Sequence, residues 1–198
     1  ALDNWKKFYQ RSAKVHTFHM HIGLGWAFAK TETVQSPYLL SMQPLMRLMV
    51  FDGMGYYYGL FKGRRTVKNQ WVPEGIVQQE LKGFDQGLGR RLWYISKGEV
   101  NELVQLIQPF QLPRHPDLWR GVGIACGYVG GSGKADMERL LHFSDECKDD
   151  LCTGIALAAI SRNASNSVSE HINLACNIIC GKPLKDVLND ESLKKQFE

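Results

Sequence analysis

The chain has 198 residues, of which 44% are hydrophobic, and its formal net charge is +4. This length suits one folded domain with a sizeable core, and the lack of any apolar run of 18 residues predicts no membrane span. The charge is too small for a dedicated nucleic-acid surface, and five cysteines without a disulfide-framework spacing favour a reduced, cytoplasmic setting.

The N-terminal segment has a helical composition but begins with aromatic residues. Trp5, Phe8 and Tyr9 lie close to the start of the chain, whereas the end of a stack of helical units normally carries a polar cap. We therefore expect one of two situations. Either this end docks on a partner or on a second copy, which would give a homo-oligomer, or the chain is a fragment that lacks preceding helices.

A phrase with two glycines separated by one residue recurs along the chain. It starts at Gly23, Gly53, Gly87 and Gly121, and a shortened form starts at Gly154, so that successive starts lie 30 to 34 residues apart. A fixed period in this range is typical of stacked supersecondary units. The phrase therefore predicts a series of similar units, each with one glycine-bearing helix.

The sequence between the phrases also predicts helices. Apolar residues at positions 103, 106, 107 and 110, and again at 172, 175, 176 and 179, follow one face of a helix. Prolines at 109, 113 and 116 separate two units, because a helix cannot continue through them. The predicted fold is all-α: a single domain, residues 1–198, forming a solenoid-like superhelical stack of antiparallel helix pairs with a period of about 34 residues.

Glycine within a helix costs about 1 kcal/mol relative to alanine, so its recurrence needs an explanation. We favour close packing, because the absence of a side chain lets a neighbouring backbone approach, as in tightly packed helix pairs. The alternative is a loop that cradles an anion, but the flanking residues are apolar and aromatic. On the packing interpretation, Gly87→Leu should unfold the protein.

Two glycine-rich patterns resemble nucleotide-binding motifs and depart from them. Residues 130–135 lack the first glycine and the magnesium-binding Ser/Thr of a P-loop. In the recurring phrases the third glycine falls one residue too late for a dinucleotide fingerprint. We therefore predict no nucleotide and no other cofactor, and we expect residues 130–135 to form an exposed turn.

The best candidates for metal ligands are His16, His19 and His21, since imidazole binds zinc, copper and iron. On a helix, however, His16 and His19 share a face from which His21 turns away, and only Glu32 supplies a nearby acid. A structural role is therefore favoured over a metal site. Because cysteine often behaves as a small buried hydrophobe, the five cysteines are expected to be core residues.

Aromatic and charged residues around the phrases form a candidate ligand-binding groove. Asp85, Arg90 and Trp93 combine charge with an aromatic wall, which can hold a carboxylate or a flat conjugated ligand. The acids that precede the phrase glycines could form a ladder along the stack or act as helix caps, and capping is favoured for Asp117. The full predicted groove consists of His21, Trp26, Asp52, Tyr56, Tyr58, Asp85, Arg90, Arg91, Trp93 and Trp119.

Residues 16–29, 51–56, 83–93 and 117–126 together resemble a bacterial family of unknown function whose members accompany the polyketide synthases of enediyne antibiotics. The stretch Phe-Asp-Gln-Gly-Leu-Gly-Arg at positions 84–90 is the most specific part, and the resemblance extends over residues 16–181. Family members are longer, with helical sequence before this chain begins, which agrees with the fragment interpretation. The resemblance implies a role in maturing a linear conjugated polyene, and it supplies neither a reaction nor catalytic residues.

Three functional hypotheses follow. The first is an accessory protein of enediyne-type polyketide biosynthesis, catalytic or not, that handles or matures a hydrophobic conjugated small molecule in the groove. The second is a non-catalytic helical-repeat scaffold that binds partner biosynthetic enzymes on its concave face. The third and weakest is a metal-dependent oxidoreductase built on the three histidines. The groove aromatics beside Asp85 and Arg90 favour the first hypothesis. A shallow, flat concave face with no enclosed pocket would favour the second, and bound iron, copper or zinc would favour the third.

Overall fold

The computed structural model describes residues 2–33 and 36–191, without the side chains of residues 2, 3, 6 and 12–15. These residues form helices and no strand, which confirms the all-α class. The α-helices are α1 (Leu2–Lys30), α2 (Pro37–Leu40), α3 (Pro44–Phe61), α4 (Gln78–Ile95), α5 (Val100–Ile107), α6 (His115–Val129), α7 (Lys134–Ser144), α8 (Lys148–Ala164), α9 (Glu170–Ile179) and α10 (Leu184–Asn189). Short turns of other helix types are η1 (Arg64–Lys68), η2 (Leu112–Arg114) and η3 (Asp145–Cys147).

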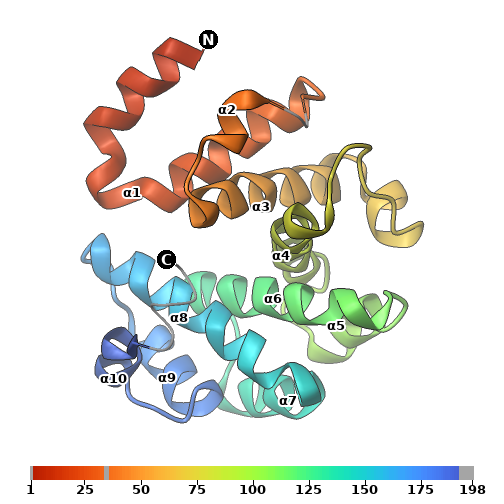
Figure 1. Cartoon of the computed structure of the whole chain (residues 1–198). Helices are drawn as coiled ribbons and strands as arrows, with labels where there is room; N and C mark the ends of the chain where they lie inside the picture. Colours follow the sequence, from red (N-terminus) through yellow and green to blue (C-terminus); the bar gives the residue numbers. More distant parts are fainter. Residues whose placement is uncertain (1, 34–35, 192–198) are drawn as a thin grey trace.

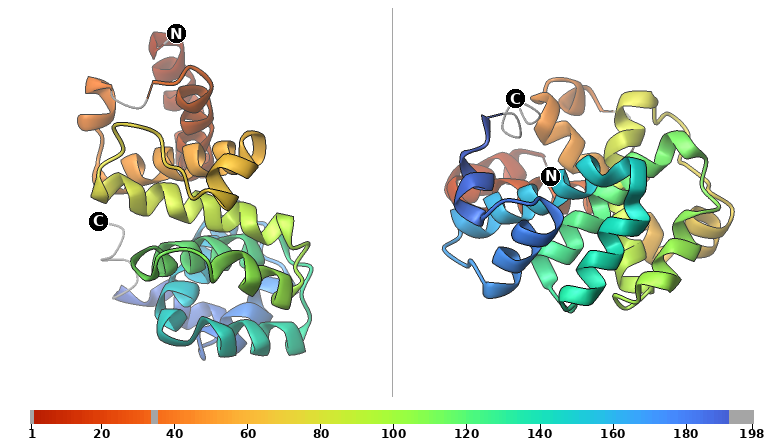
Figure 2. Two further views of the ribbon diagram at one scale, coloured as in Figure 1. Left: turned by 90° about the vertical axis from the view of Figure 1, so that its right-hand side faces the viewer. Right: turned by 90° about the horizontal axis from the view of Figure 1, so that it is seen from below.

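The helices that carry the glycine phrases, α1, α3, α4, α6 and α8, pack against one another in chain order and form a row. The main helix contacts join α1 to α3, α3 to α4, α4 to α6, and α6 to α8. α1 and α3 lie at one end of the molecule and α8 to α10 at the other (Figures 1 and 2). The intervening helices α5, α7 and α9 contact the row or one another. The finer description, a solenoid-like superhelix of antiparallel pairs, stays a prediction.

The glycine phrases are the points at which these helices touch, and the packing interpretation is confirmed. A Cβ atom added to any of eight phrase glycines would overlap a main-chain carbonyl oxygen of the neighbouring helix. Each glycine faces the carbonyl three residues before the partner helix's own glycine. The eight pairs are Gly25 with Val50, Gly53 with Ile22, Gly55 with Phe84, Gly87 with Asp52, Gly89 with Leu118, Gly121 with Gln86, Gly123 with Leu151, and Gly154 with Arg120.

These pairs make each crossing reciprocal. In the crossing of α3 and α4, for example, Gly55 faces the Phe84 carbonyl while Gly87 faces the Asp52 carbonyl. Contacts of this kind bring Cα–H groups towards carbonyl oxygens, a weak interaction that recurs at close helix interfaces. The second glycine of one phrase and the first glycine of the next therefore form one contact unit, used at four successive crossings.

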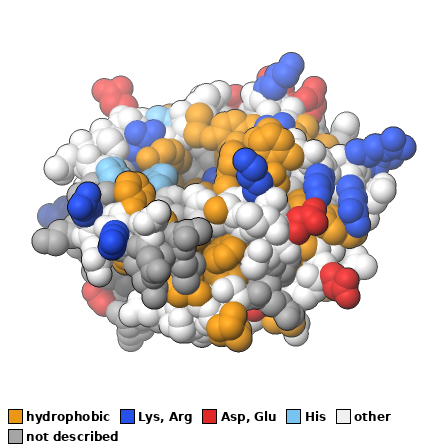
Figure 3. Space-filling view, turned by 90° about the horizontal axis from the view of Figure 1, so that it is seen from above, with side chains coloured by type: hydrophobic (Ala, Val, Ile, Leu, Met, Phe, Trp, Pro, Cys, Tyr) orange, Lys and Arg blue, Asp and Glu red, His pale blue; other side chains and the backbone are white. Residues whose placement is uncertain are grey.

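The long helix α1 is bent near its middle. His16 has non-helical backbone angles (φ −121°, ψ 25°), so the first half of α1 points in a different direction from the second half. The first half rises away from the rest of the row (Figure 1), and Figure 3 looks onto this end of the molecule. The bend leaves the second half, which carries the first glycine phrase, packed on α3.

Other connections agree with the sequence in part. α5 ends at Ile107 and α6 begins at His115, so the prolines separate two helices as predicted. Residues 130–133 join α6 to α7 without helical structure, but residues 134 and 135 belong to α7, and Gly130 and Ser132 are buried, so the predicted exposed turn over residues 130–135 is found only in part. Cys126 and Cys176 are buried, as expected of core cysteines. Cys152 and Cys180, however, form a disulfide, which the sequence analysis did not predict and which departs from the expected reduced state of the cysteines. No helix in the described part of the chain is long and apolar enough to cross a membrane.

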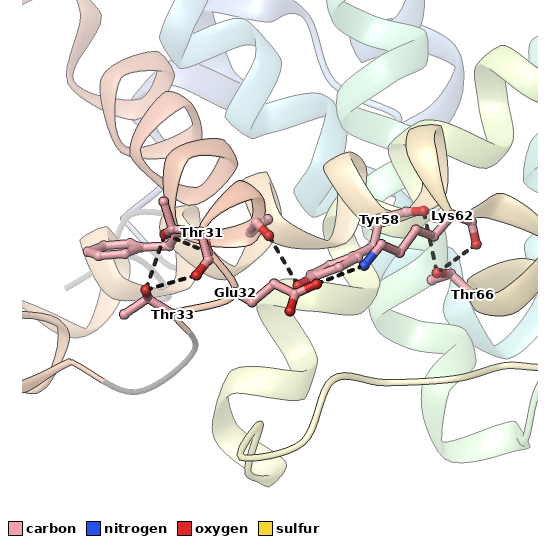
Figure 4. Close-up of polar contacts among 8 residues, drawn as sticks. Thr31, Glu32, Thr33, Tyr58, Lys62 and Thr66 are labelled. Atoms are coloured by element: carbon pink, nitrogen blue, oxygen red, sulfur yellow. Dashed lines mark hydrogen bonds and ion pairs between the residues drawn. The ribbon is translucent and has the colours of Figure 1, made fainter.

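A network of polar contacts ties the end of α1 to α3 and η1 (Figure 4). The Tyr58 hydroxyl donates to the Ala29 carbonyl at 3.3 Å, and Lys62 forms an ion pair with Glu32 at 3.1 Å. The Thr66 hydroxyl donates to the Lys62 carbonyl at 3.2 Å. In residues 62–68, a segment rich in lysine and arginine, the Arg65 guanidinium lies 3.7 Å from the centre of the Trp71 ring. Several residues of this segment therefore have structural partners.

Candidate functional site

A cavity of about 210 Å³ lies where five helices of the row meet. Because α1 and α8 both contribute to its wall, the two ends of the row come together around it. Most of the lining is apolar, and the polar groups are few. The lining residues are Phe18, His19, Ile22, Met49, Asp52, Arg90, Tyr94, Ile124, Ala125, Tyr128, Val129, Leu157, Ala158 and Ser161.

Equivalent positions of successive phrases lie side by side across the row. The residue before the first glycine is Asp52 in α3, Gln86 in α4 and Arg120 in α6. The Gln86 amide donates to Asp52 Oδ2 at 2.7 Å, and Arg120 Nε donates to Gln86 Oε1 at 2.6 Å. Arg120 also pairs with Asp117. A polar ladder does run along the row, but its members are an acid, an amide and a cation rather than the three predicted acids.

At a second set of equivalent positions, two aromatic side chains and a cation lie next to one another. The residue three positions after the first glycine is Trp26, Tyr56 or Arg90. The Trp26 and Tyr56 rings stack with their centres 5.7 Å apart, and the Arg90 guanidinium lies 5.1 Å from the centre of the Tyr56 ring. Tyr94, one turn after Arg90, contacts Tyr56 edge-on. These side chains extend from α1 to the rim of the cavity.

The main ion pair of the cavity joins Asp52 to Arg90. Arg90 Nη1 lies 2.7 Å from Asp52 Oδ1, and the Asp52 side chain is completely buried. Burial raises the pKa of Asp52, while Arg90 and the hydrogen bond from Gln86 act in the opposite direction. Two donors on one buried carboxylate fix its orientation, so Arg90 is held in place with its remaining N–H groups near the cavity.

His19 adds a neutral polar group. Burial lowers the pKa of His19, and the positive charges of Arg90, His16 and Arg162 lower it further. Its ring lies 5.2 Å from that of Tyr128, which is itself covered by the Arg162 guanidinium at 4.3 Å. An uncharged imidazole can donate or accept one hydrogen bond. Together with the guanidiniums, it gives the cavity one polar side suited to a ligand oxygen or carboxylate.

Of the predicted groove residues, Asp52 and Arg90 line the cavity. Trp26 and Tyr56 are not among the lining residues, but their rings stack and Tyr56 contacts Arg90. Three other predicted groove residues, His21, Tyr58 and Arg91, do not line the cavity. His21 was predicted to be a polar contact in the groove but does not line the cavity, because its ring packs against those of Trp5 and Tyr9. Tyr58 is buried beside Trp71, and the stem of Arg91 packs beside Gly59.

The remaining predicted residues belong to the core. Trp93 and Trp119 are both 3% exposed, so neither presents an aromatic wall to a ligand. Asp85 is almost fully buried and accepts two hydrogen bonds from Arg114, one of them from Nε at 2.8 Å. Asp85 therefore has a structural partner on η2 and does not contact Arg90.

Asp85→Asn should remove a pH dependence of stability between about pH 4 and 6. Burial raises the pKa of Asp85 from 3.8 to about 6, even though Arg114 lowers it. The folded state therefore binds this proton more tightly than the unfolded state. The stabilisation from protonation is complete below the unfolded pKa and is lost as the pH rises through the folded pKa. Urea unfolding of both proteins from pH 4 to 7 tests this, and a difference in unfolding free energy that is constant across this range contradicts it.

Sequence reasoning missed Tyr94, Tyr128 and Ser161 as lining residues. All three lie seven positions after the first glycine of their phrase, on the same helix face as the residue at position three. Aligning the phrases and extending the comparison by one turn would have found them. For His19 the sequence favoured a structural role, or hydrogen bonding near a groove, over a metal site. Within the described residues no group of three or more His, Cys, Asp or Glu is placed to hold a metal ion.

Comparison with known proteins gives one match. A family model described as "Protein of unknown function (DUF1702)" matches residues 2–196. Neither a curated protein nor a solved structure matches the chain significantly.

Proposed function

Because the chain belongs to the DUF1702 family of proteins of unknown function, we propose its function from the geometry of its cavity: it binds a narrow, hydrophobic, conjugated small molecule. The observation that carries this proposal is the mainly apolar cavity with Arg90 held at its polar side by the buried Asp52. Apolar walls with a few fixed polar groups are typical of small-molecule sites.

The size of the cavity supports a slender ligand. At about 210 Å³ it is smaller than the roughly 300–1,000 Å³ of pockets for drug-sized molecules. A linear polyene is narrow and unbranched, and its π system suits the stacked Trp26 and Tyr56 rings that lead to the rim. Its carboxyl or carbonyl end would be oriented by Arg90 and His19.

The resemblance of the glycine phrases to enediyne-associated proteins agrees with this chemistry. On that basis, the chain is an accessory protein of enediyne-type polyketide biosynthesis that holds or helps to mature a polyene intermediate in the cytoplasm. No reaction is assigned to it. The scaffold hypothesis is less favoured, because a partner-binding face does not require a cavity with a positioned cation.

The proposal is tested with parinaric acid, a linear conjugated fatty acid whose fluorescence rises in apolar surroundings. We expect saturable binding of one probe per chain. Ser161→Trp should weaken this binding at least tenfold, a change of about 1.4 kcal/mol, because the indole would occupy space at the cavity wall. The matched control is Asn163→Trp on the same helix, since Asn163 is exposed and does not line this cavity.

Two results would contradict the proposal. One is the absence of saturable binding to the folded protein. The other is equal loss of binding in the Ser161→Trp and Asn163→Trp variants, with far-ultraviolet circular dichroism unchanged in both. Arg90→Met combined with Asp52→Asn, which leaves no buried carboxylate without its cation, provides a second comparison: it should weaken binding of parinaric acid more than binding of its methyl ester, because only the acid carries a carboxylate.

A further inference from the structure

Gly23 is the exception to the packing of the phrase glycines. In α3, α4 and α6, the first glycine of the phrase contacts the preceding helix of the row and the second contacts the following helix. In α1 the second glycine, Gly25, makes its usual contact with α3. The first, Gly23, is exposed, and no atom of the described residues lies within 4 Å of where its Cβ would be. One half of a contact unit is therefore unfilled at this end of the row.

The opposite end of the row has no such unfilled position. In α8 the first glycine, Gly154, contacts α6 as the pattern requires. The position of the second glycine is taken by Ala156, which is completely buried. The open contact is therefore specific to α1 and is not a general property of helices at the ends of the row.

The surroundings of Gly23 are apolar. A groove on α1 contains Gly23 and is walled by Trp5 and Phe8 from the first half of the helix and by Leu24 and Phe28 from the second half. Phe8 is 57% exposed, so this wall of the groove presents an aromatic ring to solvent. Figure 3 looks onto this end of the molecule and shows hydrophobic side chains gathered on it. An exposed apolar surface of this kind often marks an interaction site.

The reciprocal geometry of the internal crossings indicates which partner fits. At each crossing, a glycine on either helix faces the carbonyl three residues before the glycine of the other helix. This relation is the same when the two helices are exchanged, so two identical helices can satisfy it. For Gly23 the required carbonyl is that of Met20, which lies in the same groove. An interface in which each copy offers the same patch is the isologous type found in two-fold dimers.

We propose that the chain forms a two-fold homodimer in which the α1 helices of two copies cross at Gly23. Gly23 of each copy faces the Met20 carbonyl of the other, in the register of the four internal crossings. Phe8 and Phe28 of both copies surround this contact and lose their exposure to water. The dimer thus extends the row of glycine-bearing helices from one molecule into the next.

Sedimentation analysis of the 198-residue chain between 1 and 200 µM tests the proposal. We expect a reversible dimer. Gly23→Leu should raise its dissociation constant at least tenfold, while circular dichroism and thermal unfolding of the monomer stay unchanged, because the space around Gly23 is open within one chain. The matched control is Gly63→Leu, since Gly63 also has no neighbouring atom within 4 Å and lies outside the groove.

A second variant guards against an indirect effect of Gly23→Leu. Phe8→Glu replaces an exposed side chain in the groove wall and should weaken the dimer without unfolding the chain. A wild-type protein that is monomeric at 200 µM would overturn the proposal and leave this face to a helix of another protein. A dimer that both Gly23→Leu and Phe8→Glu retain unchanged would overturn it equally.

Discussion

Gly87→Leu should prevent the chain from folding. A Cβ at this position would overlap the carbonyl oxygen of Asp52, and that carbonyl belongs to the main chain of α3. No side-chain rotation can relieve the overlap, so α3 and α4 would have to separate. Separation would also disturb the hydrogen bond from Gln86 to Asp52. We expect the free energy of unfolding to fall by more than about 4 kcal/mol, which is a large part of the stability of a typical domain.

The measurement is cooperative unfolding, followed by circular dichroism in urea, with Gly23→Leu as the matched control. Both substitutions change the first glycine of a phrase to leucine within a helix. Their helix-propensity effects are therefore similar, and only the space available differs. A cooperative transition for Gly87→Leu at nearly the wild-type urea concentration would disprove the close contact of α3 and α4.

Arg114→Met should lower the free energy of unfolding by about 3–5 kcal/mol near neutral pH. Arg114 is the main cation that contacts the buried carboxylate of Asp85, and its own side chain is only 8% exposed. Methionine has a similar length but leaves Asp85 without that cation. Since protonation would neutralise the stranded carboxyl group, the loss should be smaller at pH 4 than at pH 7.

A double variant separates charge from packing. Adding Asp85→Leu to Arg114→Met removes both charged groups and should recover most of the lost stability, because a buried ion pair can be replaced by apolar residues at little cost. The control is Arg139→Met, whose ion pair with Asp136 is partly exposed (42% and 44% for the two side chains) and should contribute less than about 1 kcal/mol. An equal decrease in the free energy of unfolding for Arg114→Met and Arg139→Met would contradict the claim that burial makes loss of the Asp85–Arg114 ion pair more costly.

The helices and their contacts were predictable because the signals are local. Apolar spacing and the positions of the prolines determine where helices begin and end. The cost of glycine in a helix makes its recurrence informative, and the contacts of Gly87 and Gly121 confirm the packing interpretation. The pairing of Trp26 with Tyr56 was also accessible, since both residues occupy the same position of their phrases.

The site was only partly predictable, because partner choice depends on non-local geometry. Asp85 lies near a phrase glycine, but its cation comes from η2, 29 residues later, and nothing in the spacing identifies Arg114. His21 lies after the bend at His16, on the second half of α1, and the bend determines that Trp5 and Tyr9 of the first half pack against its ring. The disulfide between Cys152 and Cys180 likewise depends on how α9 returns to α8.

The reciprocal glycine contacts have a consequence for how this architecture can change. Main-chain atoms set the distance between neighbouring helices, so the spacing does not depend on the side chains that face inward. Positions three and seven residues after the first glycine, such as Ile124 and Tyr94, can therefore be exchanged without moving the helices that carry them. A chain that keeps its glycines can acquire a different ligand preference through a few inward-facing substitutions, with the backbone left as it is.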